Sequence, residues 1–521
     1  MHIATDNRET GTTRRQFVLS SSAVLLLVLG IGGLFRLLLA WRSLDVLDTL
    51  FFPDDTYLSL GIARNIALGY GSTFDRVVLT NGYQPLYVWL MVPVYWLLPN
   101  DLLLPIHIAL TVLALVGIIT GWLVYLIARH LATPWHGVVA AAIWMLDPRV
   151  IGQNLNGLET GIAVLGMAAT AYWYLSRIRD HTQIPLWRVA VLGVLAGLTI
   201  LTRVDQVVFV GALGLDYLIK HRNWRVFWNL TLVGIIVALI YTPWLVLGWS
   251  IGASIIPESG AAVRLNAQGQ AAGSATWYLA ALMVCLSVLL STPYSTMLLA
   301  LGIVGTVLVR RRLKQPNDWL RQGWHRLQPL GFVLLCGLLM LLAYWLYISA
   351  YWFFDRYLHP LTLFITIALV VLLPAPALLL PRMQRVYTSS LAVMLALQCG
   401  LSAWLLVAQP APNGYLTIAR WVNANLGGST VGAFQVGAIG YWADDVEFVN
   451  LDGVVDGRAY DAIKEYRMGD YLAERNVDWV IDWTDPPGGP HVVWDERVVY
   501  VEEIPNLTTW GDTWYLFEVR E

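Results

Sequence analysis

Charged side chains are scarce in this sequence. Lys, Arg, Asp and Glu together make up 13% of its 521 residues, whereas ordinary soluble domains carry about a quarter. Hydrophobic residues make up 57%, and the mean hydropathy is +0.59. So little charge excludes a wholly soluble chain, because a water-exposed surface needs polar side chains. The composition predicts that lipid surrounds roughly the first four-fifths of the chain.

Cysteine is also scarce, and neither sign of charge dominates. The three cysteines, Cys285, Cys336 and Cys399, all lie within apolar segments, which argues against a disulfide framework and against a cysteine metal cluster. The formal net charge is −2, so the chain lacks the basic field of a nucleic-acid-binding protein. The basic residues instead form short clusters between apolar runs, which is the pattern of loops between membrane helices.

Long apolar runs are abundant. Arg14 and Arg15 precede a run over 17–40, which is too long for a signal peptide and predicts an uncleaved first span with a cytoplasmic N-terminus. The segment 41–84 is then the first outer loop. The further runs cover 85–98, 102–128, 137–146, 161–175, 189–201, 207–218, 227–249, 277–290, 296–309, 330–350, 361–380 and 391–407. Several are shorter than the ~20 residues of a full span, so we predict roughly 11–13 helices, some of them partial spans.

The composition changes near residue 410, where Pro410, Pro412 and Gly414 end the apolar region. Alternating strand and helix patterns follow. The predicted helices cover 415–426 and 462–475, and the predicted strands cover 430–435, 446–451, 479–483, 498–501 and 514–519.

The fold class is therefore a polytopic α-helical membrane domain over 1–410, followed by a small α/β soluble domain over 411–521. The tail contains a glycine-rich stretch from Gly432 to Gly440. Its spacing differs from the dinucleotide-binding fingerprint, so we interpret these glycines as sites of close packing between a helix and a strand.

The strongest local signal is a pair of adjacent carboxylates, Asp54 and Asp55, after the first span and at the start of a helical pattern. Two neighbouring carboxylates near a membrane are electrostatically unfavourable unless a cation or a proton-transfer role compensates. A structural alternative exists, since aspartate at a helix N-terminus caps backbone N–H groups and complements the helix dipole. Both interpretations stay open at this point.

Other charged residues interrupt or adjoin the apolar segments. They are Glu159, Arg203, Asp205, Asp355 and Arg356. Ionisable groups at membrane depth are functional candidates, because their burial needs partners or water. Arg203 with Asp205, and Asp355 with Arg356, could instead neutralise each other. The sharper hypothesis is an arginine that faces a lipid phosphate, since a guanidinium group presents a fork of donors that matches phosphate oxygens.

The block Asp54-Asp-Thr-Tyr-Leu-Ser-Leu-Gly-Ile-Ala-Arg-Asn, with Asn81-Gly-Tyr-Gln-Pro-Leu after it, resembles the first outer loop of GT-C glycosyltransferases. It is closest to the arabinofuranosyltransferase-like branch. Further blocks extend the resemblance over nearly the whole chain. These are Gly157-Leu-Glu-Thr, Leu201-Thr-Arg-Val-Asp, Ile256-Pro-Glu-Ser-Gly, Arg356-Tyr-Leu-His-Pro and Asn450-Leu-Asp-Gly. The family usually differs at Gly61, Gln84 and Val204, which bears on the branch more than on the superfamily.

The resemblance implies an enzyme that moves a sugar from a polyprenyl-phosphate carrier to a glycan, lipid or protein acceptor, on the outer face of a bacterial cytoplasmic membrane. One of Asp54 and Asp55 would deprotonate the acceptor hydroxyl, and the anomeric centre would invert. The other would orient the base, bind the acceptor, or hold a divalent cation such as Mg²⁺, Mn²⁺ or Ca²⁺. The residues that the resemblance implies for substrate binding are Tyr57, Arg64, Asn81, Tyr83, Glu159, Arg203, Asp205, Arg356 and His359.

Two other classes of function remain as alternatives. A secondary transporter or lipid-linked-sugar flippase would also bury charges in a helical bundle, although it explains the α/β tail poorly. A non-catalytic scaffold or receptor would leave the aspartate pair unexplained. We expect an enzyme to place the aspartate pair at the mouth of a cavity capped by the tail, and a transporter to show a central path between two related halves.

Overall fold

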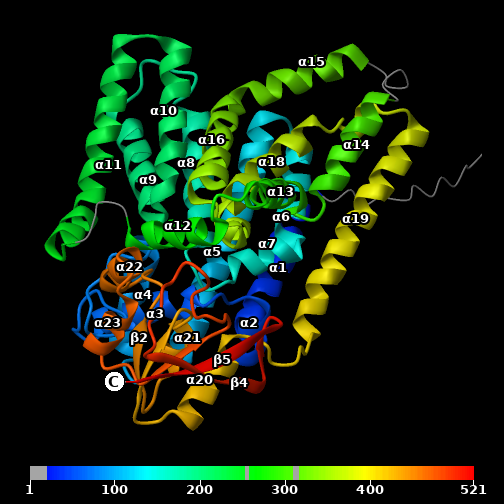
Figure 1. Ribbon diagram of the computed structural model, residues 1–521. Helices are drawn as coiled ribbons and strands as arrows, with labels where there is room; N and C mark the ends of the chain where they lie inside the picture. The colour runs from blue at the N-terminus through cyan, green and yellow to red at the C-terminus, as the bar shows by residue number, and fades with distance from the viewer. Residues whose placement is uncertain (1–19, 253–256, 309–315, 521) are drawn as a thin grey trace, which may run out of the picture.

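The computed structural model describes residues 20–252, 257–308 and 316–520. A body of helices forms one part of the molecule, and a small α/β domain packs against one end of it (Figure 1). The fold class predicted from the sequence is confirmed. The predictions that concern Arg14, Arg15, the first residues of the run over 17–40 and Ile256 lie outside the described residues.

Among the described residues, five helical segments are long and apolar enough to cross a membrane. They are α1 (Ser21–Ala40), α5 (Leu104–Leu131), α11 (Trp224–Ser250), the segment Arg321–Ile348 with α16 (Gly331–Leu342), and α19 (Pro381–Val407). Two bent pairs raise the number to as many as seven. One joins α13 (Ala275–Ser291) to α14 (Thr296–Leu308) at 74°, and the other joins Tyr351–Tyr357 to α18 (His359–Leu372) at 55°.

Shorter apolar helices complete the body, as the lengths of the apolar runs predict. They are α4 (Pro85–Leu97), α6 (Pro134–Leu146) and α9 (Leu186–Thr202). The remaining helices are α2 (Leu44–Leu50), α3 (Asp55–Ala67), α7 (Pro148–Asn154), α8 (Thr160–Arg177), α10 (Val207–His221), α12 (Glu258–Ala271), α15 (Pro316–Leu327) and α17 (Phe354–Tyr357). Helix α12 runs along the end of the body that faces the α/β domain (Figure 1).

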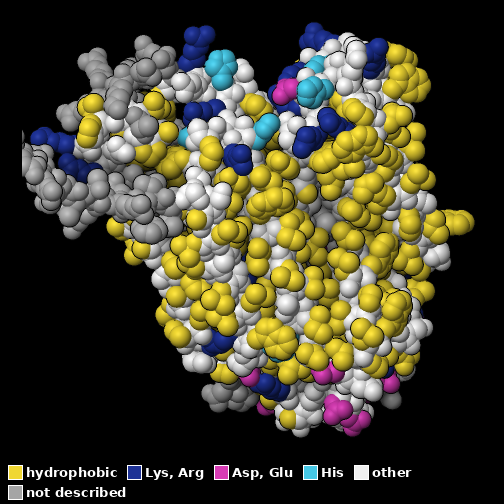
Figure 2. All heavy atoms as spheres, turned by 180° about the vertical axis from the view of Figure 1, so that it is seen from behind, with side chains coloured by type: hydrophobic (Ala, Val, Ile, Leu, Met, Phe, Trp, Pro, Cys, Tyr) yellow, Lys and Arg dark blue, Asp and Glu magenta, His cyan; other side chains and the backbone are white. Residues whose placement is uncertain are grey.

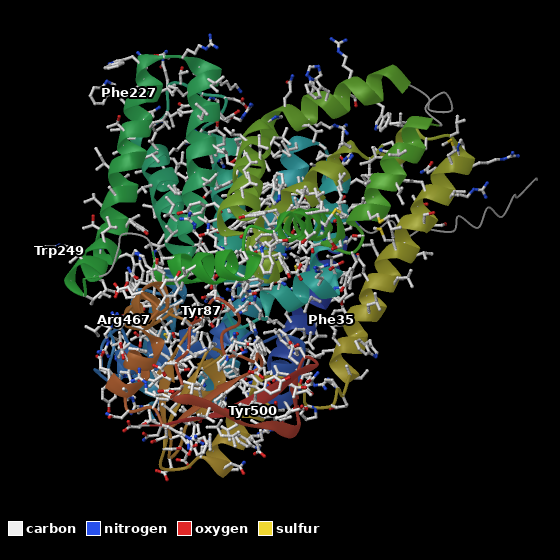
Figure 3. All side chains as sticks on the ribbon, in the orientation of Figure 1. Phe35, Tyr87, Phe227, Trp249, Arg467 and Tyr500 are labelled. Atoms are coloured by element: carbon white, nitrogen blue, oxygen red, sulfur yellow. The ribbon has the colours of Figure 1, made fainter. Side chains whose placement is uncertain are left out.

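The surface of the body is that of a membrane protein. A wide apolar band covers it, and Lys, Arg and His gather at the end away from the α/β domain (Figure 2). The turn between α10 and α11 contributes exposed Lys220, Arg222 and Arg225. Phe227 and Trp249 stand exposed near the two ends of α11 (Figure 3). Aromatic side chains at both ends of a span are typical of the two membrane–water interfaces.

The α/β domain has a mixed five-stranded sheet with strand order β2-β1-β3-β5-β4. Its strands are β1 (Thr430–Ala433), β2 (Glu447–Asn450), β3 (Trp479–Asp482), β4 (Val498–Thr509) and β5 (Asp512–Val519). Strands β2, β1 and β3 run parallel, whereas β5 pairs antiparallel with both β3 and β4. Each predicted strand is present.

Four helices accompany the sheet: α20 (Tyr415–Asn425), α21 (Gly437–Trp442), α22 (Gly457–Lys464) and α23 (Met468–Glu474). The prediction of a single helix over 462–475 is wrong, because two helices share that region. Helix α22 begins earlier, where the Asp456 side chain accepts hydrogen bonds from the backbone N–H groups of Arg458 and Ala459. The chain then turns at Tyr466, whose φ of 58° cannot continue a right-handed helix.

The α/β domain shares one apolar core with the first helices of the body. This core includes Tyr57 of α3, Leu110 of α5 and Ile439 of α21. The rings of Tyr57 and Tyr441 lie 5.8 Å apart, and the hydroxyl groups of Tyr95 and Tyr441 lie 2.8 Å apart. Burial of this apolar surface fixes the domain against the body. The loops of the domain therefore keep a defined position relative to the aspartate pair.

Candidate active site

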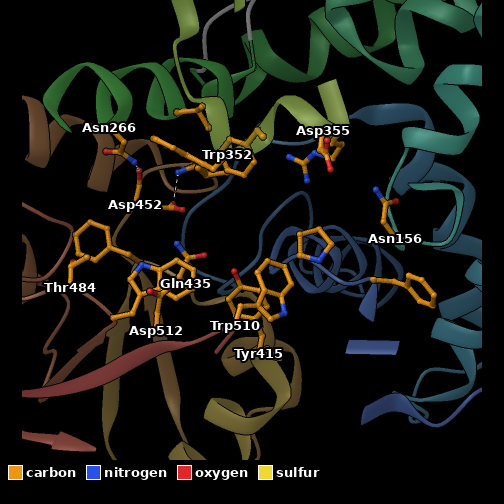
Figure 4. Close-up of a pocket in the computed structure, with 18 of the residues that line it drawn as sticks. Asn156, Asn266, Trp352, Asp355, Tyr415, Gln435, Asp452, Thr484, Trp510 and Asp512 are labelled. Carbon is orange, nitrogen blue, oxygen red and sulfur yellow. Dashed lines mark hydrogen bonds between the residues drawn. The ribbon is translucent and has the colours of Figure 1, made fainter. Parts of the chain in front are cut away.

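A cavity of about 1280 Å³ lies between the helical body and the α/β domain. The body contributes Arg149, Trp352 and Arg356 to its wall, and the α/β domain contributes Asp452 and Trp510, among others. Side chains from both parts project toward the same space (Figure 4). A concave site at a domain boundary, with a few convergent polar groups, is the usual place for a binding or active site.

Asp54 stands directly before α3 and is buried. Its Oδ2 accepts the backbone N–H of Gly437 at 2.7 Å, and its Oδ1 accepts that of Ala438 at 2.9 Å. The carboxylate thus binds the start of α21 in the other domain and makes no capping bond to its own helix. A Cβ atom on Gly437 would lie 2.3 Å from the backbone oxygen of Asp54, so this approach requires glycine.

Asp55 is the first residue of α3, and its carboxylate meets Arg356. The Nη2 atom of Arg356 lies 2.7 Å from Oδ2 of Asp55, and the two side chains are 14% and 26% exposed. Arg356 comes from α17, which buried Phe354 anchors in the body. The alternative predicted from the sequence, an ion pair between Asp355 and Arg356, is replaced by a pair between Asp355 and Arg149. We call Asp54, Asp55 and Arg356 the cavity cluster: Arg356 lines the cavity, and the two aspartates follow Pro53, which also lines it, but are not themselves among the described lining residues.

A second charged cluster lies deeper in the body. Nη1 of Arg203 lies 2.9 Å from Oε1 of Glu159, and Nη2 lies 2.7 Å from Oδ2 of Asp205. The predicted mutual pairing of Arg203 with Asp205 is confirmed, and Glu159 adds a second carboxylate. The ring of Tyr357 joins the two clusters, because its centroid lies 4.6 Å from the guanidinium carbon of Arg203 and 5.3 Å from that of Arg356. We call Glu159, Arg203 and Asp205 the buried cluster.

The arrangement of helices and α/β domain matches solved structures of membrane glycosyltransferases. ArnT from Cupriavidus metallidurans in the apo state matches with a TM-score of 0.54 and 13% identity, over 95% of this chain and 98% of that chain. The same protein bound to undecaprenyl phosphate matches with a TM-score of 0.51 and 12% identity, over the same shares of the two chains. The chain has a GT-C glycosyltransferase fold.

An archaeal protein shows the same GT-C fold. The oligosaccharyltransferase AglB from Archaeoglobus fulgidus, in complex with an inhibitory peptide and a dolichol-phosphate, matches with a TM-score of 0.52. It is 13% identical, and the match covers 88% of this chain and 69% of that chain. At such low identity the likeness is one of fold.

Two family models match parts of the GT-C chain. The model described as dolichyl-phosphate-mannose-protein mannosyltransferase matches residues 85–247, and a domain of unknown function (DUF8728) matches residues 407–517. A search of curated proteins finds no match. The GT-C fold predicted from the sequence is confirmed, whereas the activity, the sugar and the acceptor belong to the proposal below.

Burial shifts the titration of carboxyl groups where the two domains meet. It raises the pKa of Asp54 to about 7 and that of Asp452 to about 8, and the charge of nearby Asp55 adds to both shifts. The backbone N–H bonds to Asp54 act in the opposite direction. Removal from water disfavours the charged carboxylate, which explains the direction of the larger effect. Carboxyl groups that titrate near neutral pH are suited to proton exchange.

The other residues predicted for substrate binding are not among the described residues that line the cavity. The hydroxyl of Tyr57 donates to Asp48 at 2.8 Å, and Arg64 lies in the last turn of α3. Both residues belong to the helix that presents the aspartate pair. Their position is consistent with a role in holding α3 in place. Their contact with substrate stays a prediction.

Asn81, Tyr83 and His359 are likewise packed or hydrogen-bonded within the protein. Oδ1 of Asn81 accepts the N–H of Glu258 at 3.0 Å, which ties the first loop to α12. Tyr83 packs edge-on against Trp244 with ring centroids 5.1 Å apart. His359 is buried at the start of α18. These side chains do not appear among the described residues that line the cavity.

The sequence also suggested a divalent cation at Asp54 and Asp55. The part of the chain that the structure describes contains no group of three or more His, Cys, Asp or Glu residues that could hold a metal ion. Bonds from Gly437, Ala438 and Arg356 already engage three of the four carboxylate oxygens of the pair. A hard cation needs about six oxygen ligands. The cation stays a prediction, and activity after EDTA treatment and return of Mg²⁺, Mn²⁺ or Ca²⁺ checks it.

Sequence reasoning missed three residues that line the cavity or contact the aspartate pair. Gly437 belongs to the glycine-rich stretch that was interpreted only as packing, and its N–H group reaches Asp54. Arg149 follows Pro148 at the end of an apolar run, and this interruption was a usable signal. Trp510 lies in a turn between two strands, where no local pattern distinguishes it from other exposed tryptophans.

Proposed function

We propose that this chain transfers a sugar from a polyprenyl-phosphate carrier to an acceptor hydroxyl, with inversion of the anomeric carbon. The acceptor oxygen attacks that carbon while a carboxylate takes up the hydroxyl proton. The bond from the carbon to the phosphate oxygen breaks, and polyprenyl phosphate leaves with the electron pair. The observation that carries this proposal is the contact of Asp55 with Arg356 at the cavity, because it joins a proton acceptor to a cation suited to phosphate.

Asp55 is the better placed of the two candidate bases. A general base needs a carboxylate oxygen within hydrogen-bond reach of the acceptor hydroxyl. Both oxygens of Asp54 accept backbone N–H bonds inside the protein, whereas Asp55 is partly exposed and contacts a residue of the cavity wall. We assign proton uptake to Asp55. Asp54 is assigned the task of holding α21 and α3 together, which fixes the direction of its neighbour.

Arg356 is assigned to the phosphate of the leaving carrier. The leaving group is already anionic, so it needs positive charge rather than a proton. Arg149, which also lines the cavity, donates to Ser291 at 2.6 Å and pairs with Asp355. Two arginines on the side of the cavity nearest the spans suit a phosphate whose chain lies in lipid. Lipid phosphates accompany this fold in other proteins, as undecaprenyl phosphate in ArnT and dolichol-phosphate with AglB.

The surface charge supports the proposed orientation in the membrane. Lys and Arg gather at the end of the body away from the α/β domain (Figure 2), and such residues are enriched on the cytoplasmic side of membrane proteins. This pattern supports a position of the cavity and the α/β domain on the outer face of a membrane, which we propose is the bacterial cytoplasmic membrane. The short helices α2 and α3 after the first span, with the aspartate pair beside a cavity, favour an enzyme over a transporter.

The test uses purified protein in lipid and a panel of radiolabelled polyprenyl-phosphate sugars. We expect wild type to release or transfer sugar from one donor, and Asp55→Asn to lose about 10²–10⁴ of that activity. Asp45→Asn is the matched control, because Asp45 pairs with Arg420 at an exposed site. Donor binding without turnover in Asp55→Asn supports the assigned role. A panel in which wild type binds no donor contradicts the proposal and favours the transporter.

A further inference from the structure

The α/β domain presents a row of aromatic rings to the cavity. Tyr415, Trp483 and Trp510 all line it. The centroids of the Tyr415 and Trp510 rings are 5.5 Å apart, and those of Tyr415 and Trp483 are 5.9 Å apart. Tyr415 is buried and contacts both of the other rings. We call these three residues the aromatic wall.

Trp510 occupies an unusual place for a large side chain. It is the first of two residues in the turn between β4 and β5, since Thr509 pairs with Asp512. Its φ is 53° and that of Gly511 is 99°. Such turns favour Asn, Asp or Gly, because other side chains are strained at positive φ. The indole is nevertheless 51% exposed, so neither burial nor backbone geometry accounts for a tryptophan here. Strain of this kind is concentrated at functional sites.

The two sides of the cavity differ in charge. The body supplies Arg149 and Arg356 to the wall. The α/β domain supplies Asp452, Asp482 and Asp512, and among its described residues that line the cavity there is no Lys or Arg. Carboxyl groups exchange hydrogen bonds with hydroxyl groups, whereas an anionic ligand would find no cationic partner on this side. This side of the cavity is therefore suited to a neutral, hydroxyl-rich ligand.

An aromatic residue also stands on the opposite side. Trp352 projects from the body toward the side of the cavity that holds Tyr415 and Trp510 (Figure 4). Its ring packs edge-on against Trp277, which lines the cavity as well, with centroids 5.8 Å apart. Sugar rings have apolar C–H faces and polar edges, so they bind between aromatic faces with their hydroxyls directed to carboxylates and amides. Gln435 and Thr484 add such polar groups.

We propose that the aromatic wall is the binding site for a neutral oligosaccharide acceptor. This inference rests on the proposed function, because it assigns the acceptor of that reaction to one chemical class. The acceptor lies on Trp510 and Trp483, its hydroxyls bind Asp482 and Asp512, and its reacting end points to Asp55. The donor phosphate binds on the opposite, basic side.

The test is binding of the full chain, labelled and held in lipid nanodiscs, to a printed array. The array carries neutral pentose and hexose oligosaccharides, uronic-acid and sulfated oligosaccharides, and Lys-rich and Arg-rich peptides. We expect wild type to bind neutral oligosaccharides. Trp510→Ala is expected to weaken that binding about tenfold, which is the size of one lost aromatic stacking contact. Trp510→Phe, which keeps an aromatic face, is expected to lose less.

Tyr466→Ala is the matched control. Tyr466 is also an exposed aromatic residue of the α/β domain at positive φ, with 69% exposure and a φ of 58°, and it lies outside the cavity lining. We expect it to bind as wild type does. The inference is overturned when wild type binds no neutral oligosaccharide or prefers the anionic glycans or the peptides. It is also overturned when Trp510→Ala binds neutral oligosaccharides as tightly as wild type does.

The donor assay separates this inference from the proposed function. If wild type binds neutral oligosaccharides but consumes no polyprenyl-phosphate sugar, the binding site is supported and the proposed glycosyltransferase activity is refuted. If wild type consumes donor but does not bind neutral oligosaccharides, the glycosyltransferase activity is supported and the aromatic wall is refuted as an acceptor site. Consumption of donor together with binding that depends on Trp510 supports both.

Discussion

The two charged clusters of this GT-C fold contain the same chemical groups in different surroundings. Each combines one arginine with two carboxylates, and Tyr357 lies between the arginines. In the buried cluster, Arg203 binds both Glu159 and Asp205 and is almost fully enclosed. In the cavity cluster, Arg356 has a single carboxylate partner and borders open space.

This difference shows which charges are available to a ligand. An arginine with two carboxylate partners inside a protein is neutralised locally, and removal of one partner leaves a buried charge. An arginine with one partner at a cavity wall keeps donors for an incoming anion. Both clusters interrupt apolar sequence, so the sequence marks both as candidates. We therefore expect substitutions in the cavity cluster to affect turnover and those in the buried cluster to affect stability.

The largest expected effect is on turnover in Asp55→Asn. The amide keeps the size of the side chain but cannot take up a proton, so we expect kcat to fall by about 10²–10⁴. The thermal midpoint should stay within a few degrees of wild type, because Asp55 is partly exposed. Sugar transfer and thermal unfolding in the same lipid preparation measure both. Full activity in this variant would show that Asp55 is not the general base and would favour Asp54 for that role.

Arg203→Met is expected to destabilise the protein by about 3–5 kcal/mol, because it leaves Glu159 buried without its cation. Thermal unfolding measures the loss. The control adds Glu159→Gln and Asp205→Asn to the same chain, which removes the unpaired charges and should restore much of the stability. A stable Arg203→Met protein that no longer binds donor would reverse the comparison and assign phosphate binding to the buried cluster.

Arg356→Lys keeps a positive charge but loses the planar fork of donors. We expect kcat/KM for the donor to fall on the order of 10²-fold, with less change in stability than in Arg203→Met. Arg458→Lys serves as the control, because Arg458 pairs with Glu474 at the surface of the α/β domain. Donor titrations of initial rate give the value. An Arg356→Lys enzyme with unchanged kcat/KM would show that the carrier phosphate binds elsewhere.

Gly437→Ala tests whether the cavity cluster depends on the α/β domain. The added Cβ atom would meet the backbone of Asp54 at 2.3 Å, so α21 and α3 must separate. We expect a loss of about 1–3 kcal/mol in stability together with lower turnover. Gly427→Ala is the control, since its Cβ atom makes only an ordinary contact 3.6 Å from Asp445. Equal behaviour of the two variants would mean that the Asp54 contact contributes little.

The smallest expected effect is the pH dependence of stability. Burial raises the pKa of Asp54 from 3.8 to about 7, so the folded protein favours the protonated group more than the unfolded chain does. The stabilisation is complete below the unfolded pKa and is lost as the pH rises through about 7. We expect the thermal midpoint to fall between pH 5 and pH 8, and Asp54→Asn to flatten that decline. A midpoint that rises over this range contradicts the assigned direction.

The sequence predicts the helices of the body well, because each span is a long run of apolar residues between clusters of charge. Helix α11 (Trp224–Ser250) differs from the predicted run over 227–249 by only a few residues at its ends. Helix α12 was missed, since Glu258–Ala271 contains few large apolar residues and so forms no apolar run. Apolar runs mark the helices that face lipid, whereas a helix that covers a domain boundary leaves no such run in the sequence.

The candidate site is only half predictable from sequence. The pair Asp54 and Asp55 is conspicuous because two adjacent carboxylates follow a span. The contact from Asp54 to Gly437 joins residues 383 positions apart, and no local pattern connects them. The partner of Arg356 was also beyond local reasoning, because the neighbouring Asp355 offered a simpler ion pair than Asp55. Spatial partners of this kind require the packing of the α/β domain on the body.

The bond between Asp54 and Gly437 has a consequence for synthesis. A ribosome that has made α1 and Asp54 must add 383 further positions before the partner of Asp54 exists. Until then the α/β domain does not cover the carboxylates, and only the wall that the helical body contributes to the cavity is present. A nascent chain arrested between α19 and α20 would contain all five of the long apolar helical segments found among the described residues and yet have no enclosed site. On the proposed function, sugar transfer can therefore begin only after translation of the α/β domain, which keeps carrier-bound sugars from a site that is still open.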